Sequence, residues 1–196
     1  GFQPIIDEIC KFLPAKRQTL LFSATFPGDI ERLSKRLMKR PVRVEVDSEH
    51  DMTSIRQILY EIPDKGARST ALLAVLQRHQ PVSALVFCQT KVLTEEIAAV
   101  LRDQGYMALA INGDLDQKDR ESRLVQFTNK SLTVLVATDV AARGLDIDSL
   151  DLVINYHLTK DPEVHTHRIG RTGRAGSTGL ACSLYHSSEA YKLELI

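Results

Sequence analysis

Arginine and glycine residues alternate near the end of the chain, in the segment HRIGRTGRAG at residues 167–176. Arg168, Arg171 and Arg174 recur at every third position, with glycines between them. A guanidinium group is planar, stays charged and donates paired hydrogen bonds to phosphate or carboxylate oxygens. Arginines at this density therefore indicate an anion site, and the glycines allow tight turns and a close approach of the backbone.

Small hydroxyl residues, glycines and carboxylates follow several short apolar runs that we expect to be strands. These segments are SAT at 23–25, CQT at 88–90, NGD at 112–114 and TDVAARGLD at 138–146. In open parallel α/β sheets, ligands bind outside the carboxyl ends of the strands. Because these segments would meet at one edge of the sheet, we expect that edge to carry the binding site.

The sequence lacks the parts of a complete nucleotide and metal site. The loop pattern GxxxxGK[ST] does not occur, and the nearest segment, KGARST at 65–70, has neither its residue order nor its lysine. Asp7 and Glu8 lie within a predicted helix rather than after a strand, so they are not a typical magnesium-binding pair. His165 and His167 have no third ligand at a suitable spacing, and we predict no metal site.

Strands and helices are expected to alternate along the chain. Continuous Val, Ile and Leu runs such as VLVA at 134–137 are typical of strands buried on both faces. We therefore predict an α/β fold with a mostly parallel sheet and helices on both faces. Two further strands are predicted in the first part, QTLLFSAT at 18–25 and VRVEV at 42–46, and a last helix at 187–196.

Composition limits the partners and the compartment. Lys plus Arg and Asp plus Glu number 25 each, so the formal net charge is zero and any nucleic-acid contact must come from local clusters. The three cysteines have no CxxC spacing, which favours reduced thiols in a cytoplasmic protein. The apolar runs have the length of strands, so we expect no membrane partner.

The ordered segments SAT, VFCQT, QKDR, ATDVAARGLDI and HRIGRTGR resemble the later motifs of DEAD-box ATP-dependent RNA helicases. The resemblance covers essentially the whole chain, and GDLDQKDR and DPEVHTHRIGRTGRAG are similar to the bacterial DbpA type. It implies two three-layer RecA-like domains joined by a linker. Residues 1–47 would be the incomplete tail of the first, ATP-binding domain, 48–54 the linker and 55–196 the second domain.

The same resemblance implies that ATP binds between the two domains with Mg²⁺. The phosphate loop and the carboxylates that hold both would lie upstream of Gly1, outside this chain. Arg171 and Arg174 match arginine fingers, which stabilise the charge that develops on the γ-phosphate and are worth roughly 10³–10⁵ in rate. His167 would couple this motif to the carboxylate box of the other domain. Arg168 has no finger role in this match, and a local salt bridge is the alternative.

Further site residues follow from the resemblance. Ser23, Ala24 and Thr25 would couple ATP hydrolysis to RNA binding. Gly144 would bring its backbone close to ATP, and Asp146 would accept a hydrogen bond from the ribose. Contacts to RNA phosphates and sugars, which position RNA without reading its sequence, would come from Thr90, Gly113, Gln117, Arg120, Thr138, Asp139 and Arg143. Asn112 replaces a histidine that is commoner in the family and receives no role.

We therefore expect the C-terminal half of an ATP-dependent RNA helicase that remodels short RNA duplexes, acting on structured ribosomal RNA in ribosome assembly. Without a phosphate loop, the chain alone is expected to have no ATPase activity. The alternative is a non-catalytic RNA- or protein-binding module on a RecA-like scaffold. Besides RNA, the partner would be the missing first domain. We expect a monomer, or an oligomer formed by swapping residues 1–47.

Overall fold

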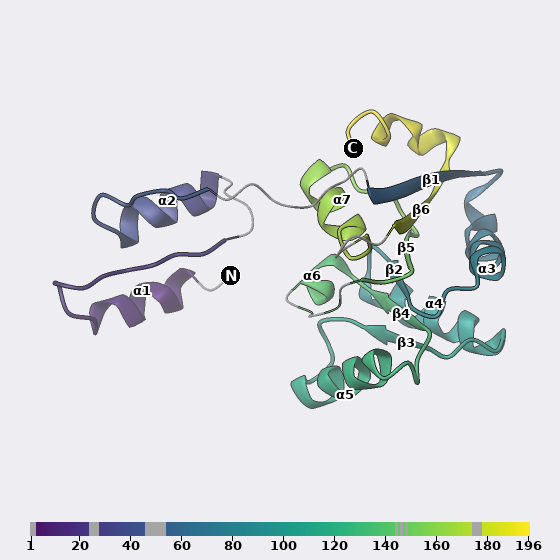
Figure 1. The fold of residues 1–196 in the computed structure, drawn as a ribbon, viewed down its shortest axis with the longest axis horizontal. Coiled ribbons are helices and arrows are strands. Elements are labelled where there is room, and N and C mark those ends of the chain that lie inside the picture. Colours follow the sequence, from purple (N-terminus) through teal and green to yellow (C-terminus); the bar gives the residue numbers. More distant parts are fainter. Residues whose placement is uncertain are drawn as a thin grey trace. The chain divides into compact units, whose positions relative to one another are not determined.

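The chain divides into two compact units, residues 1–48 and 49–196, whose helices and strands are drawn in Figure 1. In this computed structural model, the structure describes residues 3–23, 28–45, 54–143, 145, 147, 149–173 and 178–196. The predicted linker at 48–54 thus lies outside the described residues except for Ser54.

The first unit contains two helices, α1 (Gln3–Lys11) and α2 (Gly28–Leu37). Arg36 pairs with Asp7 at 2.8 Å. The strands predicted at 18–25 and 42–46 were wrong, because their described residues, 18–23 and 42–45, are not in a strand. A strand needs a neighbour for its backbone N–H and C=O groups, and no sheet occurs among the described residues of this unit.

The second unit is built on a six-stranded sheet in the order β1-β6-β5-β2-β4-β3. Every neighbouring pair of strands is parallel, which goes beyond the predicted mostly parallel sheet. The strands are β1 (Ile55–Ile62), β2 (Ala84–Phe87), β3 (Ala108–Ile111), β4 (Val134–Ala137), β5 (Leu152–Asn155) and β6 (Gly179–His186).

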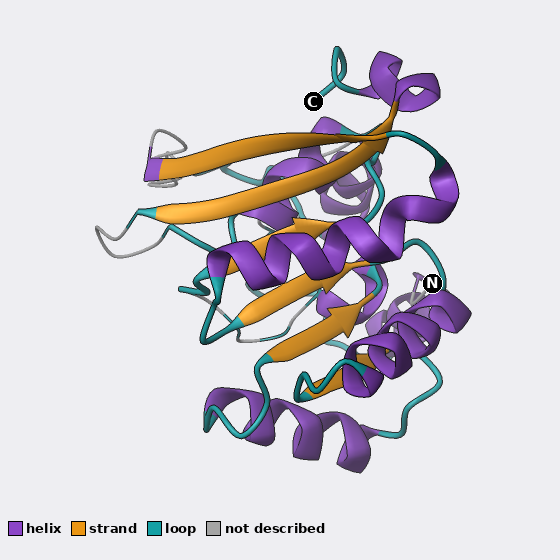
Figure 2. Ribbon diagram, turned by 90° about the vertical axis from the view of Figure 1, so that its right-hand side faces the viewer, coloured by secondary structure: helices purple, strands orange, loops and turns teal. Residues whose placement is uncertain are grey.

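Helices cover both faces of this sheet (Figure 2). Successive side chains of a strand point to opposite faces. In β2, Val86 therefore packs in the core on one face of the sheet, and Leu85 and Phe87 pack in the core on the other face. The first core contains α3 (Arg68–His79) and α4 (Lys91–Asp103). The second contains α5 (Gln117–Thr128), α6 (Asp139–Ala142) and α7 (Pro162–Ile169). The predicted three-layer α/β fold is confirmed.

Polar side chains start four helices at the carboxyl edge of the sheet. Thr90 accepts a hydrogen bond from the N–H of Leu93 at 3.2 Å, and the other three caps act in the same way. They are Asp116 for α5, Thr138 for α6 and Asp161 for α7. Among the described helices, none is long and apolar enough to cross a membrane.

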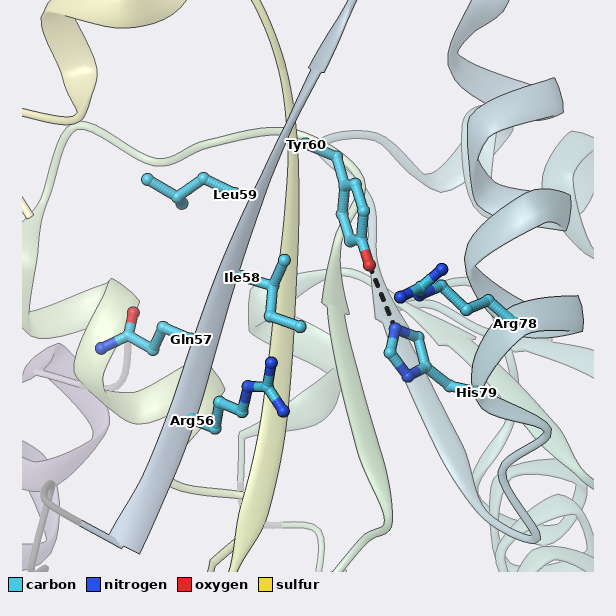
Figure 3. A pocket seen from close by; sticks show the side chains of 7 residues that line it. All are labelled: Arg56, Gln57, Ile58, Leu59, Tyr60, Arg78 and His79. Carbon is cyan, nitrogen blue, oxygen red and sulfur yellow. Dashed lines mark hydrogen bonds between the residues drawn. The ribbon is translucent and has the colours of Figure 1, made fainter.

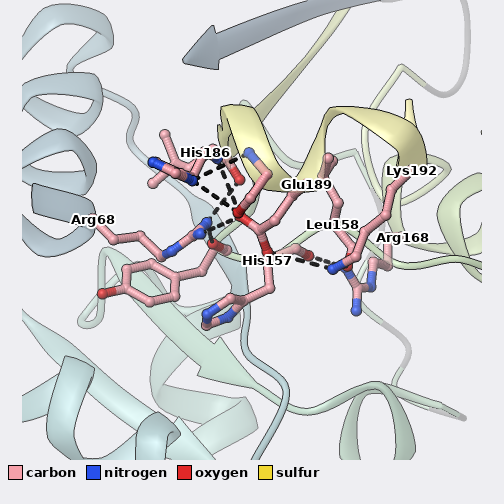
Figure 4. A network of polar contacts seen from close by, with 10 residues as sticks. Arg68, His157, Leu158, Arg168, His186, Glu189 and Lys192 are labelled. Atoms are coloured by element: carbon pink, nitrogen blue, oxygen red, sulfur yellow. Dashed lines mark hydrogen bonds and ion pairs between the residues drawn. The ribbon is translucent and has the colours of Figure 1, made fainter. Parts of the chain in front are cut away.

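The C-terminal segment is held by a buried polar network (Figure 4). Arg68, which is 3% exposed, donates to the carbonyls of Tyr156 at 2.6 Å and Leu184 at 2.9 Å and to Glu189 at 2.5 Å. Glu189 lies in η3 (Ser187–Lys192), so the predicted last helix is a 3-10 helix that ends at Lys192. Burial raises the pKa of Glu189, but hydrogen bonds from the His186 N–H and Arg68 outweigh it and lower that pKa to about 2.

Replacing Glu189 with Gln should destabilise the second unit in a pH-dependent way. The change leaves the buried Arg68 without its counter-charge, and we expect the free energy of unfolding near neutral pH to fall by about 3 kcal/mol. The carboxylate has a lower pKa in the folded state, so its contribution is complete above its ordinary pKa of 4.5 and is lost as the pH falls through about 2. Urea unfolding across this range checks the prediction, and a pH-independent difference between wild type and variant would contradict it.

Candidate functional site

Most of the described residues predicted to bind ATP or RNA lie at the carboxyl ends of the strands, which we call the carboxyl edge of the sheet. β2 lies between β4 and β5 in the sheet. The helix after β2 packs in the first core, whereas the helices after β4 and β5 pack in the second. Connections that leave neighbouring strands toward opposite faces open a crevice at the carboxyl ends, where open α/β sheets bind their ligands.

Arg168 of α7 is the buried centre of this edge. Its Nε and Nη2 atoms donate to the two carboxylate oxygens of Asp139 at 2.6 and 2.8 Å. Its Nη1 donates to the side chain of Asn155 at 3.0 Å and to the carbonyl of His157 at 2.8 Å. The guanidinium also lies 5.2 Å from the ring centre of Phe87. The predicted local salt bridge of Arg168 is therefore confirmed, and it joins α7 to α6 and to the end of β5.

A small pocket of about 30 Å³ lies beside this ion pair. Its lining combines Phe87 with Arg143, His167, Arg168 and Arg171. The Nη1 of Arg171 donates to the carbonyl of Leu145 at 2.9 Å, which fixes the direction of that side chain. The carboxylate of Asp139, which also lines the pocket, is occupied by Arg168. The pocket therefore presents positive charge, which suits a phosphate group.

His165 and His167 have different surroundings although they are two residues apart. His165 is 6% exposed, and its Nε2 lies 2.9 Å from the side-chain oxygen of Gln57. Burial first, and then the nearby Arg168, lower the pKa of His165, so this ring is neutral near pH 7. His167 is exposed and lines the pocket, so its ring is accessible to a ligand or to another domain.

The residues predicted to contact RNA surround the starts of α4, α5 and α6. Thr90 and Thr138 use their oxygen atoms as helix caps, which leaves their hydroxyl protons available for an acceptor. Gly113 and Gln117 are exposed. Helix N-termini and hydroxyl donors at one edge form a surface that suits phosphate oxygens.

Arg120 and Asp139 make contacts within the domain. Arg120 donates through Nη2 to the carbonyls of Ala141 at 2.8 Å and Arg143 at 3.2 Å. It thereby holds the end of α6, while Asp139 at the start of α6 holds Arg168. Both side chains therefore fix the short helix α6, whose Asp139 and Ala142 line the pocket.

Asn112 has a structural role that sequence reasoning missed. It is 4% exposed, and its amide donates to Thr94 at 3.3 Å and to Glu95 at 3.0 Å. Its side-chain oxygen accepts from the N–H of Asp114 at 3.0 Å, and Asp114 in turn pairs with Lys91. These contacts fasten the loop that carries Gly113 to α4. The sequence signal that could have indicated this role is an asparagine placed directly after the apolar run at 108–111.

Five predicted site residues lie outside the described part of the chain: Ala24, Thr25, Gly144, Asp146 and Arg174. Ser23 is described and exposed, and it belongs to the first unit. Their predicted roles in ATP binding, catalysis and coupling stay predictions.

Comparison with known proteins gives a family and close relatives. The family model described as helicase conserved C-terminal domain matches residues 67–176. The chain is 50% identical over 196 residues to the ATP-dependent RNA helicase DbpA of Escherichia coli, covering 100% of the chain and 43% of that protein. The chain thus spans less than half of the length of this relative.

Two solved structures resemble the chain at the level of the fold. A DEAD box protein from Methanococcus jannaschii has a TM-score of 0.69 at 40% identity, covering 99% of this chain and 52% of that one. Dbp5 of S. cerevisiae, solved bound to Gle1 and IP6, has a TM-score of 0.76 at 27% identity, covering 99% and 50%. These likenesses confirm the predicted RecA-like fold and the resemblance to DEAD-box helicases.

Replacing Gly179 with Ala should disturb the backbone after the arginine-rich segment. A Cβ atom at Gly179 would lie 2.3 Å from the N atom of Gly173, which itself has φ of +69°. Because backbone cannot give way as a flexible side chain does, we expect a loss of about 3 kcal/mol in the free energy of unfolding. In the matched variant Gly113→Ala the new Cβ meets Lys91 at an ordinary 3.5 Å, and we expect a change within about 0.5 kcal/mol. Equal urea midpoints for both variants would refute this explanation.

Proposed function

Since the chain belongs to the helicase conserved C-terminal domain family and to the DEAD-box RNA helicases, we propose that it forms the second RecA-like domain of an ATP-dependent RNA helicase. Residues 55–196 would be that domain, 48–54 the linker and 1–47 the tail of the first domain. The observation that carries the proposal is the pocket at the carboxyl edge, where Arg143, His167 and Arg171 converge beside the Arg168–Asp139 pair.

The pocket residues fit the phosphate end of ATP. A guanidinium has five N–H donors, so the contact of Arg171 with Leu145 is compatible with phosphate binding. Arg171 and Arg174 would act as arginine fingers, and His167 would contact the carboxylates of the other domain. Gly144 and Asp146 would bind the ribose side of the nucleotide. ATP bound with Mg²⁺ supplies the phosphoryl group for hydrolysis, and the Mg²⁺ and phosphate-loop ligands would come from the first domain.

RNA would bind at the neighbouring helix starts through its phosphates and sugars. Thr90, Gly113, Gln117 and Thr138 would make these contacts, supported by their exposure or by their positions as helix caps. Arg120 and Asp139 would serve RNA binding as positioning residues, because Arg120 donates to neighbouring backbone carbonyls and Asp139 accepts from Arg168. The first domain would contribute Ser23, Ala24 and Thr25.

Helix α6 would couple the two ligands. Thr138, which we propose contacts RNA, caps its start, and Arg143 after its end lines the pocket. A ligand that fixes one end of this four-residue helix restricts the other. ATP and RNA that both favour a closed arrangement of the two domains would therefore strengthen each other's binding. Closure would bend one RNA strand and separate short duplexes, and hydrolysis would reopen the domains.

We further propose that the helicase acts on structured ribosomal RNA, that it serves ribosome assembly and that it is located in the cytoplasm. The identity with DbpA supports the subfamily. Cys10, Cys88 and Cys182 are free thiols, and the absence of a disulfide among them is compatible with a reducing compartment. The exposed Phe12 and Phe22 in the first unit support a partner there: the rest of the first domain, or a second copy in a swapped oligomer.

Replacing Arg171 with Ala, in a protein that contains both domains, should lower the RNA-stimulated kcat for ATP hydrolysis by about 10³ because a finger acts on the transition state. RNA affinity in the presence of a non-hydrolysable ATP analogue should stay within about threefold. Lys130→Ala, at an exposed position after α5, is the matched control and should leave both unchanged.

Hydrolysis by the Arg171→Ala protein at the wild-type rate would reject the finger assignment. A two-domain parent that binds RNA but shows no ATP hydrolysis would instead support a non-catalytic binding module.

A further inference from the structure

An open hollow of about 810 Å³ lies along β1, with Arg78 and His79 of α3 beside it (Figure 3). Nothing in the proposed helicase function uses this region. We propose that the outer edge of β1 binds an extended acidic segment of a partner protein, which adds to the sheet as a further strand.

The two edge strands of the sheet, β1 and β3, differ in whether their outward-facing backbone groups have hydrogen-bond partners. At the β3 edge, Arg102 donates to the carbonyl of Ala108 at 3.1 Å and Arg123 donates to the carbonyl of Ala110. These guanidiniums occupy outward-facing acceptors and protect that edge from pairing with another chain. β1 pairs with β6 alone, and within the described part of the chain no group caps its outer side.

The length and exposure of β1 suit strand addition. The strand has eight residues, and all of them except Ile55 and Ile62 at its ends are exposed or half-buried. Alternate residues of an edge strand direct their N–H and C=O groups outward. Another extended polypeptide satisfies such a row of donors and acceptors, whereas an RNA backbone has only acceptors and hydroxyls to offer.

Two arginines make one face of β1 positive, whereas the exposed carboxylate of Glu61 shares the other face with Leu59. Arg56 and Arg78 are both exposed, and among the described residues neither forms an ion pair with a carboxylate. Figure 3 shows both side chains on the side of β1 where Tyr60 bonds to His79 at 3.1 Å. Burial first, and then Arg78 and Arg56, lower the pKa of His79, so this ring stays neutral and the two guanidiniums carry the charge.

The opposite face of β1 offers an apolar contact. Leu59 is 48% exposed and points to the other side of the strand from Arg56 and Tyr60 (Figure 3). A bound strand would therefore place carboxylates near the two arginines and apolar side chains near Leu59, in alternation. Because β1 is the outermost strand and only β6 pairs with it, a strand added to its outer side leaves the carboxyl ends of β2, β4 and β5 open.

A fluorescein-labelled peptide of about eight residues, alternating Glu and Val, tests the proposal by fluorescence anisotropy with the whole chain. We expect binding that weakens about tenfold when alternate peptide nitrogens are methylated, because those donors can no longer pair with β1. The double variant Arg56→Glu and Arg78→Glu should also bind about tenfold more weakly. Lys130→Glu, a matched reversal at a distant exposed position, should bind as wild type does.

Hydrogen exchange locates the bound peptide, with slower exchange expected at residues 55–62. No binding at about 1 mM peptide, equal binding of the methylated peptide, or protection only elsewhere would each overturn the proposal. Binding of a single-stranded RNA that depends on Arg56 and Arg78, with no peptide binding, would show a nucleic-acid site there and reject it as well.

Discussion

The buried guanidinium of Arg168 is the constraint on which the rest of the site depends. A charge that is 3% exposed needs complete pairing, and Asp139, Asn155 and the carbonyl of His157 supply it. These three partners come from α6, from β5 and from the loop after β5, so satisfying one side chain fixes three elements at once. His167 directly precedes Arg168 and Arg171 follows three residues later, so the position of Arg168 also determines where these two pocket residues lie.

This arrangement explains why the arginines of the segment at 167–176 have different roles. Arg168 lines the pocket but gives its hydrogen bonds to Asp139, Asn155 and His157, whereas Arg171 lines the same pocket and donates to the carbonyl of Leu145. Arg120 and Asn112 make similar holding contacts for α6 and for the Gly113 loop. The proposed ligand contacts thus rest on a layer of buried and half-buried polar residues that holds their elements in place.

The sequence predicted the second unit well because its signals are local. The continuous apolar run at 134–137, for example, was predicted to be a buried strand and is β4 (Val134–Ala137). The strands at 18–25 and 42–46 failed because strand formation requires a neighbour in space. The motifs predicted that the site residues meet at the carboxyl ends of the strands, and many of the described ones lie there. The inward contacts of Asp139, Arg120 and Asn112 depend on tertiary packing, which residue spacing does not reveal.

A double-mutant cycle on Asp139 and Arg168 tests the central claim most directly. The free energy of unfolding would be measured for Asp139→Asn, Arg168→Met and the double variant. If the pair anchors the edge, each single change costs about 3 kcal/mol and the double variant costs little more than one of them, a coupling of about 2 kcal/mol or more. Additive losses, with a coupling near zero, would contradict the account.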